Sequence, residues 1–382
     1  MSFELKPKSP LKIHDAVLIG GGHAHALVLR ALGRYPLGNT RLTLINPGPT
    51  APYSGMLPGH IAGHYPRETL DIDLVDLARF ARAELVFGAA DAIDLERKVI
   101  SVKGREIAYD VASIDVGIHA QMPELEGFLS HGVAVKPLDG ISESWRLYLE
   151  AIKAGKAPER VAVIGGGVAG AEIAMAMAHA MKSAGRQGEV TVIDAGAGLL
   201  GLRPKARKRI SRAMGDLNVT LREHSPVARV EQGAVVLANG ARIAAGFIVG
   251  AGGARAYDWL AASDLPVNDE GFVFCDPTLQ VTGVASLFAV GDCAYMPHAP
   301  RPKAGVYAVR AAPILAHNLR VAVSGEGKMA AFHPQRDVLK LMSLGGKSAL
   351  AQKWGIVQSG ALWWRWKDRI DRRFMAQFTD YD

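Results

Sequence analysis

The chain repeats one pattern twice: an apolar run, a glycine loop, a helical stretch and a second apolar run. The first copy comprises residues 15–19, Gly20-Gly21-Gly22, 24–35 and 41–45. The second copy comprises residues 160–164, Gly165-Gly166-Gly167, 172–184 and 189–194. Short apolar runs of this kind indicate buried parallel strands, because helices cover both faces of a parallel sheet. The sequence therefore predicts an α/β fold with two Rossmann-like dinucleotide-binding domains.

The segments between and after the copies predict how these domains are ordered. Residues 84–119 alternate apolar runs with turns, which indicates an antiparallel excursion, and Asn239-Gly240 predicts a hairpin within 226–252. Pro137 and Pro266 lie in the loops that lead into and out of the second copy. We therefore expect the second domain to be inserted in the first. The expected boundaries are 11–140 and 265–330 for the first domain, 141–264 for the second, and 331–382 for a small C-terminal segment.

The composition excludes several classes of protein. With 49% hydrophobic and 21% charged residues, the 382-residue chain can bury large cores, so disorder is not expected. Its two cysteines, Cys275 and Cys293, exclude a disulfide framework and a zinc cysteine pair. Because we find neither a signal-peptide pattern nor a 20-residue apolar span, we expect a cytoplasmic protein. The net charge of +7 comes with no nucleic-acid motif, so we expect no nucleic-acid partner.

The second glycine loop carries a complete G-x-G-x-x-G pattern. Gly165 allows the tight turn, Gly167 lets a diphosphate approach the backbone, and Gly170 lets helix and strand pack closely. Val168 and Ala169 lie between these glycines, where the first N–H groups of the helix would face the diphosphate. The pattern and its context predict a dinucleotide site.

The residue that ends the following strand predicts which dinucleotide binds. Asp194 holds this position in the second copy, where a carboxylate accepts both ribose hydroxyls and repels a 2′-phosphate. NADH is therefore expected, and NADPH is less favoured. Asn46 stands at the same position in the first copy and can hydrogen-bond a ribose with less charge assistance.

The first glycine loop departs from the pattern. Gly20 and Gly22 are in place and are followed by His23 and Ala24, but His25 stands where the third glycine is expected. We expect the helix to stand off from the strand, or the His25 ring to point outward, because an imidazole prevents close packing. Two histidines without a third nearby ligand favour a nucleotide loop over a metal centre. No metal is therefore expected.

A third motif indicates which domain holds a flavin. The apolar run after residue 283 ends in Gly291-Asp292. With the two glycine loops in this order, the chain resembles the pyridine nucleotide–disulfide oxidoreductase superfamily over essentially its whole length. The resemblance implies FAD at the first loop, NAD(P)H on the inserted domain, and Asp292 on the flavin ribityl chain.

Several stretches narrow the resemblance to one subgroup, the oxidoreductase associated with selenide, water dikinase. These stretches are residues 52–59, 113–117, 301–310 and 364–375. The architecture of the subgroup is similar to that of type II NADH dehydrogenases and sulfide:quinone reductases.

The resemblance also implies roles around the flavin. Tyr53 and Met56 lie in the loop where relatives keep a redox dithiol, and are expected to wall the isoalloxazine ring. Lys303 and Ala304 precede an expected helix and would lie near flavin N1/O2, where Lys303 would stabilise the anionic reduced flavin. The alternative for Lys303 is a surface lysine.

Glu172 lies two residues after Gly170, where type II NADH dehydrogenases carry a glutamate near the meeting point of flavin and nicotinamide. It would assist proton transfer or position the nicotinamide. The alternative is an acid that only stabilises the first turn of the helix. Glu172 and Lys303 are thus the candidate catalytic residues.

The cysteines constrain the route of the electrons. The loop over 52–59 contains no sulfur, and Cys275 and Cys293 are not spaced as a working pair, which disfavours two-cysteine sulfide oxidation. The predicted function is hydride transfer from NADH to FAD, followed by electron transfer to a quinone-like or other small acceptor. Two alternatives remain open: an oxidoreductase of sulfur or selenium species, and a redox-sensing flavoprotein that docks to a partner.

The C-terminal segment mixes aromatic and basic residues at helical spacing. The apolar positions are Leu362, Trp363, Trp366, Ile370, Phe374 and Phe378, and the basic ones are Arg365, Lys367, Arg369, Arg372 and Arg373. Such a helix is typical of peripheral contact with an anionic membrane, here the inner face of the cell membrane through 360–382. The alternatives are packing on the first domain or on a second subunit of a homodimer. Residues 303–312 lack the paired alanine–glutamine elements of the quinone pocket in type II NADH dehydrogenases.

Overall fold

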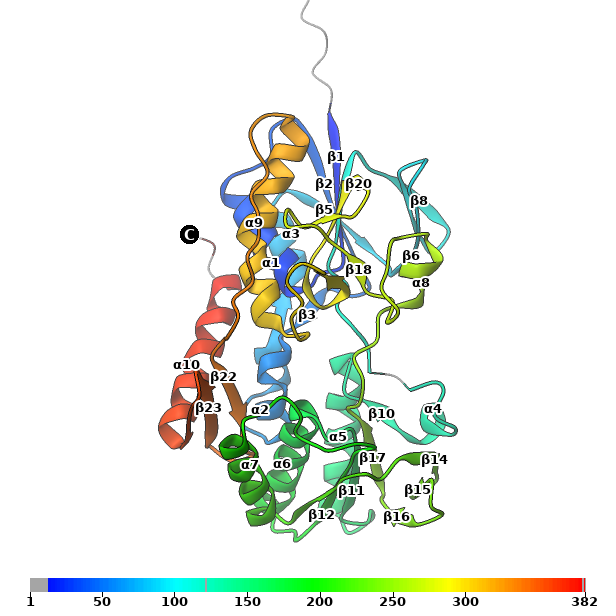
Figure 1. Ribbon diagram of the computed structural model, residues 1–382, viewed down its shortest axis with the longest axis vertical. Helices are drawn as coiled ribbons and strands as arrows, with labels where there is room; N and C mark the ends of the chain where they lie inside the picture. The colour runs from blue at the N-terminus through cyan, green and yellow to red at the C-terminus, as the bar shows by residue number, and fades with distance from the viewer. Residues whose placement is uncertain (1–12, 121, 380, 382) are drawn as a thin grey trace, which may run out of the picture.

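The computed structural model describes residues 13–120, 122–379 and 381. The N-terminal residues 1–12, where no signal peptide is expected, lie outside the described residues, as do positions 380 and 382 at the other end. The protein consists of two sheet-centred units, one above the other in Figure 1, with the C-terminal elements against their side. The α/β class predicted from the sequence is confirmed.

The upper unit is built on a six-stranded sheet with the order β19-β20-β9-β1-β2-β5. All neighbours are parallel except β19 and β20. The strands are β1 (His14–Ile19), β2 (Thr40–Asn46), β5 (Ala83–Phe87), β9 (Val111–Ile114), β19 (Gln280–Val281) and β20 (Val284–Ala289). Since β20 follows the whole lower unit in sequence, the second domain is inserted in the first, as predicted.

The lower unit is built on a fully parallel sheet with the order β10-β17-β11-β12-β13. The strands are β10 (Val133–Ala134), β11 (Arg160–Ile164), β12 (Glu189–Ile193), β13 (Val219–Arg222) and β17 (Phe247–Gly250). The helices around it are α4 (Phe128–His131), α5 (Leu138–Lys153), α6 (Val168–Ser183) and α7 (Pro204–Asp216). The runs predicted at 160–164 and 189–194 are thus neighbouring strands, which places their carboxyl ends side by side.

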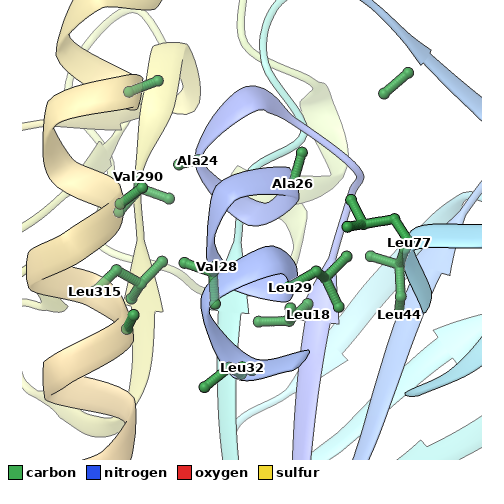
Figure 2. Close-up of a cluster of buried hydrophobic side chains, with 14 of the residues drawn as sticks. Leu18, Ala24, Ala26, Val28, Leu29, Leu32, Leu44, Leu77, Val290 and Leu315 are labelled. Atoms are coloured by element: carbon green, nitrogen blue, oxygen red, sulfur yellow. The ribbon is translucent and has the colours of Figure 1, made fainter. Parts of the chain in front are cut away.

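Helix α1 (His23–Arg34) packs between the upper sheet and α9 (Gly305–Ser324). Figure 2 shows Val28 of α1 facing Leu315 of α9, with Leu29 on the side of the sheet and of α3 (Leu74–Phe80). Each such side chain, when fully buried, stabilises the fold by about 1.5–3 kcal/mol. This packing fixes the N-terminus of α1 above the ends of the sheet strands.

Two antiparallel pieces interrupt the parallel sheets. One contains β6 (Ala90–Asp94), β7 (Val99–Val102) and β8 (Arg105–Ala108), and the other contains β14 (Val227–Glu231), β15 (Ala234–Leu237) and β16 (Arg242–Ala244). The predicted Asn239-Gly240 hairpin joins β15 to β16. The excursion predicted over 84–119 is too long, because its outer runs are β5 and β9 of the parallel sheet. A short apolar run does not distinguish these two kinds of strand.

The C-terminal elements form a three-stranded antiparallel sheet and one helix. They are β22 (Lys340–Ser343), β23 (Ala349–Lys353), β24 (Ile356–Gly360), α10 (Ala361–Met375) and the 3-10 helix η4 (Ala376–Phe378). Helix α10 packs on this sheet, and α7 of the lower unit lies beside its strands β23 and β24 (Figure 1). The helix was predicted from the sequence, whereas the sheet was not.

The remaining short elements connect these layers. They are β3 (Thr50–Pro52), η1 (Ser54–Met56), α2 (Leu57–Ile61), η2 (Arg67–Leu70), β4 (Asp71–Asp73), α8 (Asp258–Ala262), β18 (Val273–Phe274), η3 (Gly291–Cys293) and β21 (Ala294–Tyr295). Among the described residues, no helix is both long and apolar enough to cross a membrane.

Candidate functional site

A cavity of about 450 Å³ lies along the first glycine loop, at the carboxyl ends of the upper sheet. Six of the residues predicted to bind a cofactor line this cavity: Gly20, Gly22, His23, Asn46, Gly291 and Asp292. In open α/β sheets, ligands bind at this edge. The structure therefore brings the first glycine loop and the late Gly-Asp motif together around one space, although 271 positions separate their first glycines.

The loop keeps its shape through backbone constraints that only glycine meets at key positions. Gly20 has φ +89°, and a Cβ there would lie 2.5 Å from the carbonyl oxygen of Asp115. The Gly21 N–H donates to Asn46 Oδ1 over 2.9 Å, and the Asn46 amide donates to the Gly48 carbonyl. Asn46 thus fixes the loop as well as facing the cavity.

His25 does not point outward, which corrects one of the two expectations for this residue. Its ring is fully buried beneath the loop, with Nδ1 2.7 Å from the Gly20 carbonyl and Nε2 2.8 Å from Ser113 Oγ. Burial lowers its pKa to about 4, so the ring is neutral at pH 7. The histidine therefore replaces glycine packing with a polar layer between α1 and β9.

Asp115 and Lys136 are cavity residues that the sequence predictions missed. Asp115 directly follows β9, and its carboxylate accepts from the N–H groups of Ala24 and His25 at the start of α1. Lys136 donates to Asp292 Oδ2 over 3.3 Å. The position of Asp115 at the end of an apolar strand, level with Gly20, was a usable signal, whereas nothing in the local sequence marks Lys136.

The second glycine loop has the close packing that its pattern predicts. Gly165 has φ +114°, and a Cβ on Gly170 would lie 1.9 Å from the Gly165 carbonyl oxygen. A Cβ on Gly167 would meet nothing within 4 Å, so the outer side of the loop is open. Val168 and Ala169 form the first turn of α6. The loop therefore leaves space where a diphosphate would approach the helix N-terminus.

Asp194 follows β12 and holds two loops by its carboxylate. Oδ2 accepts from the Gly166 N–H over 2.6 Å, and Oδ1 accepts from the Gly196 N–H over 2.8 Å. The first bond links the same two positions as the bond between Asn46 and Gly21 in the upper unit. In both copies, the side chain after the second strand therefore accepts a hydrogen bond from the glycine loop. The acceptor is the charged carboxylate of Asp194 in the second copy and the neutral amide of Asn46 in the first.

Glu172 lies on the first turns of α6 and is half-buried, next to Ser343 of the C-terminal sheet. The N–H of Ser343 donates to its Oε1 over 2.6 Å, and burial raises its pKa to about 7, although Lys367 and the Ser343 bond oppose the shift. The Ser343 hydroxyl is itself buried without a partner among the described residues. A carboxyl group with a pKa near neutrality can give up or accept a proton at pH 7.

The prediction that Lys367 belongs to an exposed basic face is wrong. Its ammonium donates to Asp371 Oδ2 over 2.6 Å and to the carbonyl of Gly55 over 2.7 Å, and its side chain is largely buried. The Tyr53 hydroxyl donates to Asp371 Oδ1 over 3.1 Å. These contacts join α10 to the loop over 52–59, and place a cation between that loop and Glu172.

The two residues expected to wall the flavin, Tyr53 and Met56, lie in different surroundings within the loop over 52–59, which we call the flavin loop. Met56 is fully buried in the core around α1, so its side chain does not line the cavity. The Tyr53 ring packs against His23 and Phe374, with centroid distances of 5.2 and 4.6 Å. Pro52 and Ser54 of the same loop line the cavity instead.

Lys303 is partly buried rather than a free surface lysine. Its ammonium donates to the Ala294 carbonyl over 2.8 Å and lies 3.5 Å from the centre of the Phe272 ring. With Ala304, it lines a smaller cavity that shares Gly291 and Asp292 with the main one. Burial lowers the pKa of Lys303.

Neither cysteine is available as a thiolate. Cys275 and Cys293 are completely buried in one apolar cluster, and burial raises the pKa of both thiols. Their Sγ atoms lie near backbone carbonyl oxygens, Cys275 near that of Ala289 and Cys293 near that of Val290. Both therefore act as small apolar side chains in this structure.

Helix α10 presents two different faces. Phe374 of α10, and Phe378 of the following η4, are buried in the core of the upper unit. Leu362, Trp366 and Ile370 are 75%, 56% and 42% exposed, and follow one another at four-residue spacing. The apolar stripe predicted from the sequence is thus divided: its C-terminal part packs on the protein and its N-terminal part faces outward.

The structure thus holds two parallel-sheet units that each carry a glycine loop before a helix, and both cysteines are buried away from the loop over 52–59. The family model described as pyridine nucleotide-disulphide oxidoreductase matches residues 14–312, and the chain belongs to this family. This membership confirms the resemblance inferred from the motifs. It makes the chain an oxidoreductase and implies FAD and NADH as its cofactors.

Individual proteins agree with this assignment. An NADH dehydrogenase-like protein of Bacillus subtilis is 25% identical over 291 residues, which cover 74% of this chain and 78% of the relative. The type II NADH:quinone oxidoreductase of Haemophilus influenzae is 28% identical over 148 residues, covering 35% and 33%. The structure of the sulfide:quinone oxidoreductase of Aquifex aeolicus has a TM-score of 0.80 at 18% identity, covering 97% and 92%. The similarity to the Aquifex aeolicus structure, at 18% identity, shows a shared fold only.

The residues present fit both cofactors. For FAD, the cavity runs from Asn46 past the first glycine loop to Asp292, with the N-terminus of α1 beside it. For NADH, the loop before α6 is open at Gly167 and ends beside Asp194. When bound, FAD supplies the hydride and electron chemistry, and the protein supplies position and charge.

Proposed function

We propose that this protein is an FAD-dependent NADH dehydrogenase that passes electrons from the flavin to a quinone-like acceptor without a redox dithiol. FAD occupies the domain of residues 11–140 and 265–330, NADH the domain of 141–264, and the segment 331–382 completes the acceptor side. The observation that carries the proposal is the arrangement of Glu172, Lys367 and Asp371. Lys367 bonds to buried Asp371 and to Gly55 of the cysteine-free loop beside the cavity, and its charge acts on Glu172 in the first turns of α6 in the NADH domain.

The residues divide into binding and catalytic roles in this proposal. Gly20, Gly22, His23, Ala24 and Asn46 hold the FAD adenosine diphosphate. Asp292 and Gly291 hold the ribityl chain, and Lys303 with Ala304 lies beyond them. The NADH site is formed by Gly165, Gly167, Val168, Ala169, Gly170 and Asp194. Glu172 exchanges a proton with the acceptor or positions the nicotinamide.

The names of relatives support the nucleotide and the acceptor. The Bacillus subtilis relative is called NADH dehydrogenase-like, and the Haemophilus influenzae relative reduces a quinone by its name. The carboxylate of Asp194 would repel the 2′-phosphate of NADPH, which favours NADH. A sulfur or selenium substrate is the second candidate, but both cysteines have raised thiol pKa values and lie in an apolar cluster.

Anaerobic addition of NADH is expected to bleach the flavin absorbance of the purified holoenzyme, because hydride transfer reduces the isoalloxazine ring. NADPH is expected to do so at least tenfold more slowly, since the Asp194 carboxylate opposes its phosphate. Stopped-flow absorbance measures both rates, and a series of quinones then tests reoxidation. A flavin that neither nucleotide reduces would overturn the proposal, and faster reduction by NADPH would reverse the nucleotide preference.

We further propose that α10 rests on an anionic membrane surface. Leu362, Trp366 and Ile370 are exposed on this helix, and Arg365, Arg369 and Arg373 are exposed beside them. Apolar residues with aromatic and basic neighbours are typical of helices that lie in the membrane interface. A lipid-soluble acceptor would then reach the protein next to the Lys367 contact with the flavin loop.

Replacing Leu362, Trp366 and Ile370 together by serine is expected to reduce binding to phosphatidylglycerol vesicles at least tenfold, since these side chains supply the apolar contact. Cosedimentation with the vesicles measures the binding. Serine at Leu129 and Leu147, equally exposed apolar residues on α4 and α5, is the matched control and should leave binding unchanged. Loss of self-association in place of vesicle binding, seen by sedimentation equilibrium, would assign this face to a homodimer instead.

A further inference from the structure

The FAD cavity contains an acid at a position where an anion is expected to bind. Asp115 Oδ2 accepts from the N–H of Ala24 over 2.9 Å and from that of His25 over 3.1 Å. These are the second and third residues of α1. The side chain is only 3% exposed, yet Asp115 lines the cavity. A carboxylate of the protein thus already occupies two of the helix N–H groups that attract a phosphate.

The Asp115 carboxyl group is confined on two sides by glycine backbone. A Cβ on Gly22 would lie 2.3 Å from Asp115 Cγ, and a Cβ on Gly291 would lie 2.3 Å from its Oδ1. The carboxyl group therefore fits only because both neighbours are glycines. It cannot turn away from the N-terminus of α1 unless one of these loops moves.

The two histidines at the start of α1 supply no positive charge beside Asp115, and the His25 ring is directed to the Gly20 carbonyl and the Ser113 hydroxyl. Burial lowers the pKa of His23, and it lowers that of His25 to about 4. The adjacent Cys293 thiol is also neutral, because burial raises its pKa. No cation on these elements compensates the charge of Asp115.

The remaining charged groups near Asp115 come from η3 and from the segment before α5. Asp292 lies on η3, and its charge adds to the burial that raises the pKa of Asp115 to about 7. The Lys136 ammonium donates a hydrogen bond to Asp292 over 3.3 Å and forms an ion pair with that residue instead of with Asp115. The two backbone bonds from α1 act in the opposite direction but are outweighed by burial.

We propose that Asp115 takes up one proton when FAD binds, so that the affinity for FAD falls as the pH rises. This inference rests on the proposed FAD site. A diphosphate bound at the N-terminus of α1 would add negative charge next to the Asp115 carboxylate, and like charges in a site of low dielectric constant strongly disfavour double ionisation. The solvent supplies the proton, and the protonated Asp115 still accepts from Ala24 and His25 through its carbonyl oxygen.

The direction of the pH effect follows from this coupling. Below about pH 7, Asp115 is already protonated in the free protein, so binding takes up little further proton and the Kd is nearly constant. Above that pH, binding requires protonation, and the Kd rises by up to about tenfold per pH unit until the pKa of the complex is reached. We expect the Kd to rise at least tenfold between pH 6 and 9.

Equilibrium dialysis of the holoenzyme against graded FAD at each pH measures the Kd, with bound flavin read by fluorescence after denaturation. Asp115→Asn, and separately Asp115→Ser, should bind FAD with a Kd that changes less than twofold over the same range. Asp216→Asn makes the same chemical change at an exposed position at the end of α7, and should keep the slope of the wild type.

Each outcome decides between the inference and its alternatives. A flat wild-type profile, or equal slopes in the wild type and the Asp115 variants, overturns the coupling while leaving the FAD site intact. A wild type that binds no FAD at any pH contradicts the proposed function itself. If neither Asp115 variant folds by circular dichroism, proton uptake is measured on the wild type with a pH indicator during FAD binding at pH 8. Uptake of less than half a proton per FAD then overturns the inference.

Discussion

Gly170→Ala is expected to reduce the rate at which NADH reduces the flavin at least 100-fold, while FAD stays bound. The added Cβ would lie 1.9 Å from the Gly165 carbonyl oxygen, so the start of α6 must move away from the loop. A displacement of about 1 Å at a reacting group costs roughly 100-fold in rate. Anaerobic stopped-flow reduction by NADH and the flavin content of the purified variant measure the two effects.

Two further glycines provide matched controls for Gly170. A Cβ on Gly167 meets no atom within 4 Å, so Gly167→Ala should leave the free energy of unfolding unchanged and raise the KM for NADH, because the methyl group enters the diphosphate space. Gly215→Ala, within α7, also meets nothing and should stabilise the protein by about 0.5–1 kcal/mol. Wild-type reduction rates in Gly170→Ala, or loss of its FAD, would contradict the assignment of this loop to NADH.

The glycine loops were predictable from the sequence because their constraints are local. A tight turn with positive φ at Gly165 and close packing at Gly170 restrict the residue type within six positions of chain. Asp194 and Asn46 were predictable for a related reason: each follows an apolar strand whose end lies beside its own loop. The order of these patterns also predicted the inserted domain, because one sheet is interrupted and completed later.

The acceptor side could not be predicted in the same way, because its contacts join distant segments. Tyr53 and Asp371 are hydrogen-bonded across 318 positions of sequence, and Ser343 meets Glu172 across 171. Lys367 has the same local pattern as its exposed neighbours on α10, and only the packing of that helix makes it an internal cation. The C-terminal strands were missed since their short, mixed sequences show little alternation of apolar and polar residues.

Glu172 can take part in both steps of the proposed reaction, the reduction of the flavin by NADH and its reoxidation by the acceptor. Its carboxyl group has a pKa of about 7 and is therefore largely protonated below that pH, when it can donate a proton to a reduced acceptor. The neighbouring Lys367 is held by Asp371 and by the flavin loop, which keeps the ammonium from neutralising Glu172 by direct contact. Proton donation should then decline as the pH rises through 7.

Glu172→Gln is expected to slow reoxidation of the reduced flavin by a short-chain quinone about 100-fold at pH 6, within the usual range for loss of a general acid. The wild-type rate should fall above pH 7, and the variant rate should be independent of pH. Stopped-flow reoxidation from pH 5.5 to 9 measures both. Glu143→Gln removes an exposed carboxylate from α5 and should change neither rate nor profile.

The same substitution separates proton transfer from nicotinamide positioning. If Glu172 only positions the nicotinamide, Glu172→Gln raises the KM for NADH and leaves the pH profile of reoxidation unchanged. Stability gives an independent check. The raised pKa means that the folded state binds the proton more tightly than the unfolded state, so stability falls as the pH rises from about 4.5 to 7, and the full cost is present above pH 7. Glu172→Gln removes this cost, and its free energy of unfolding at pH 8.5 should exceed that of the wild type by about 3 kcal/mol, against about 1 kcal/mol or less at pH 5. Equal stabilities at both pH values would show that the carboxyl group is not held in this desolvated environment, and the general-acid role would lose its physical basis.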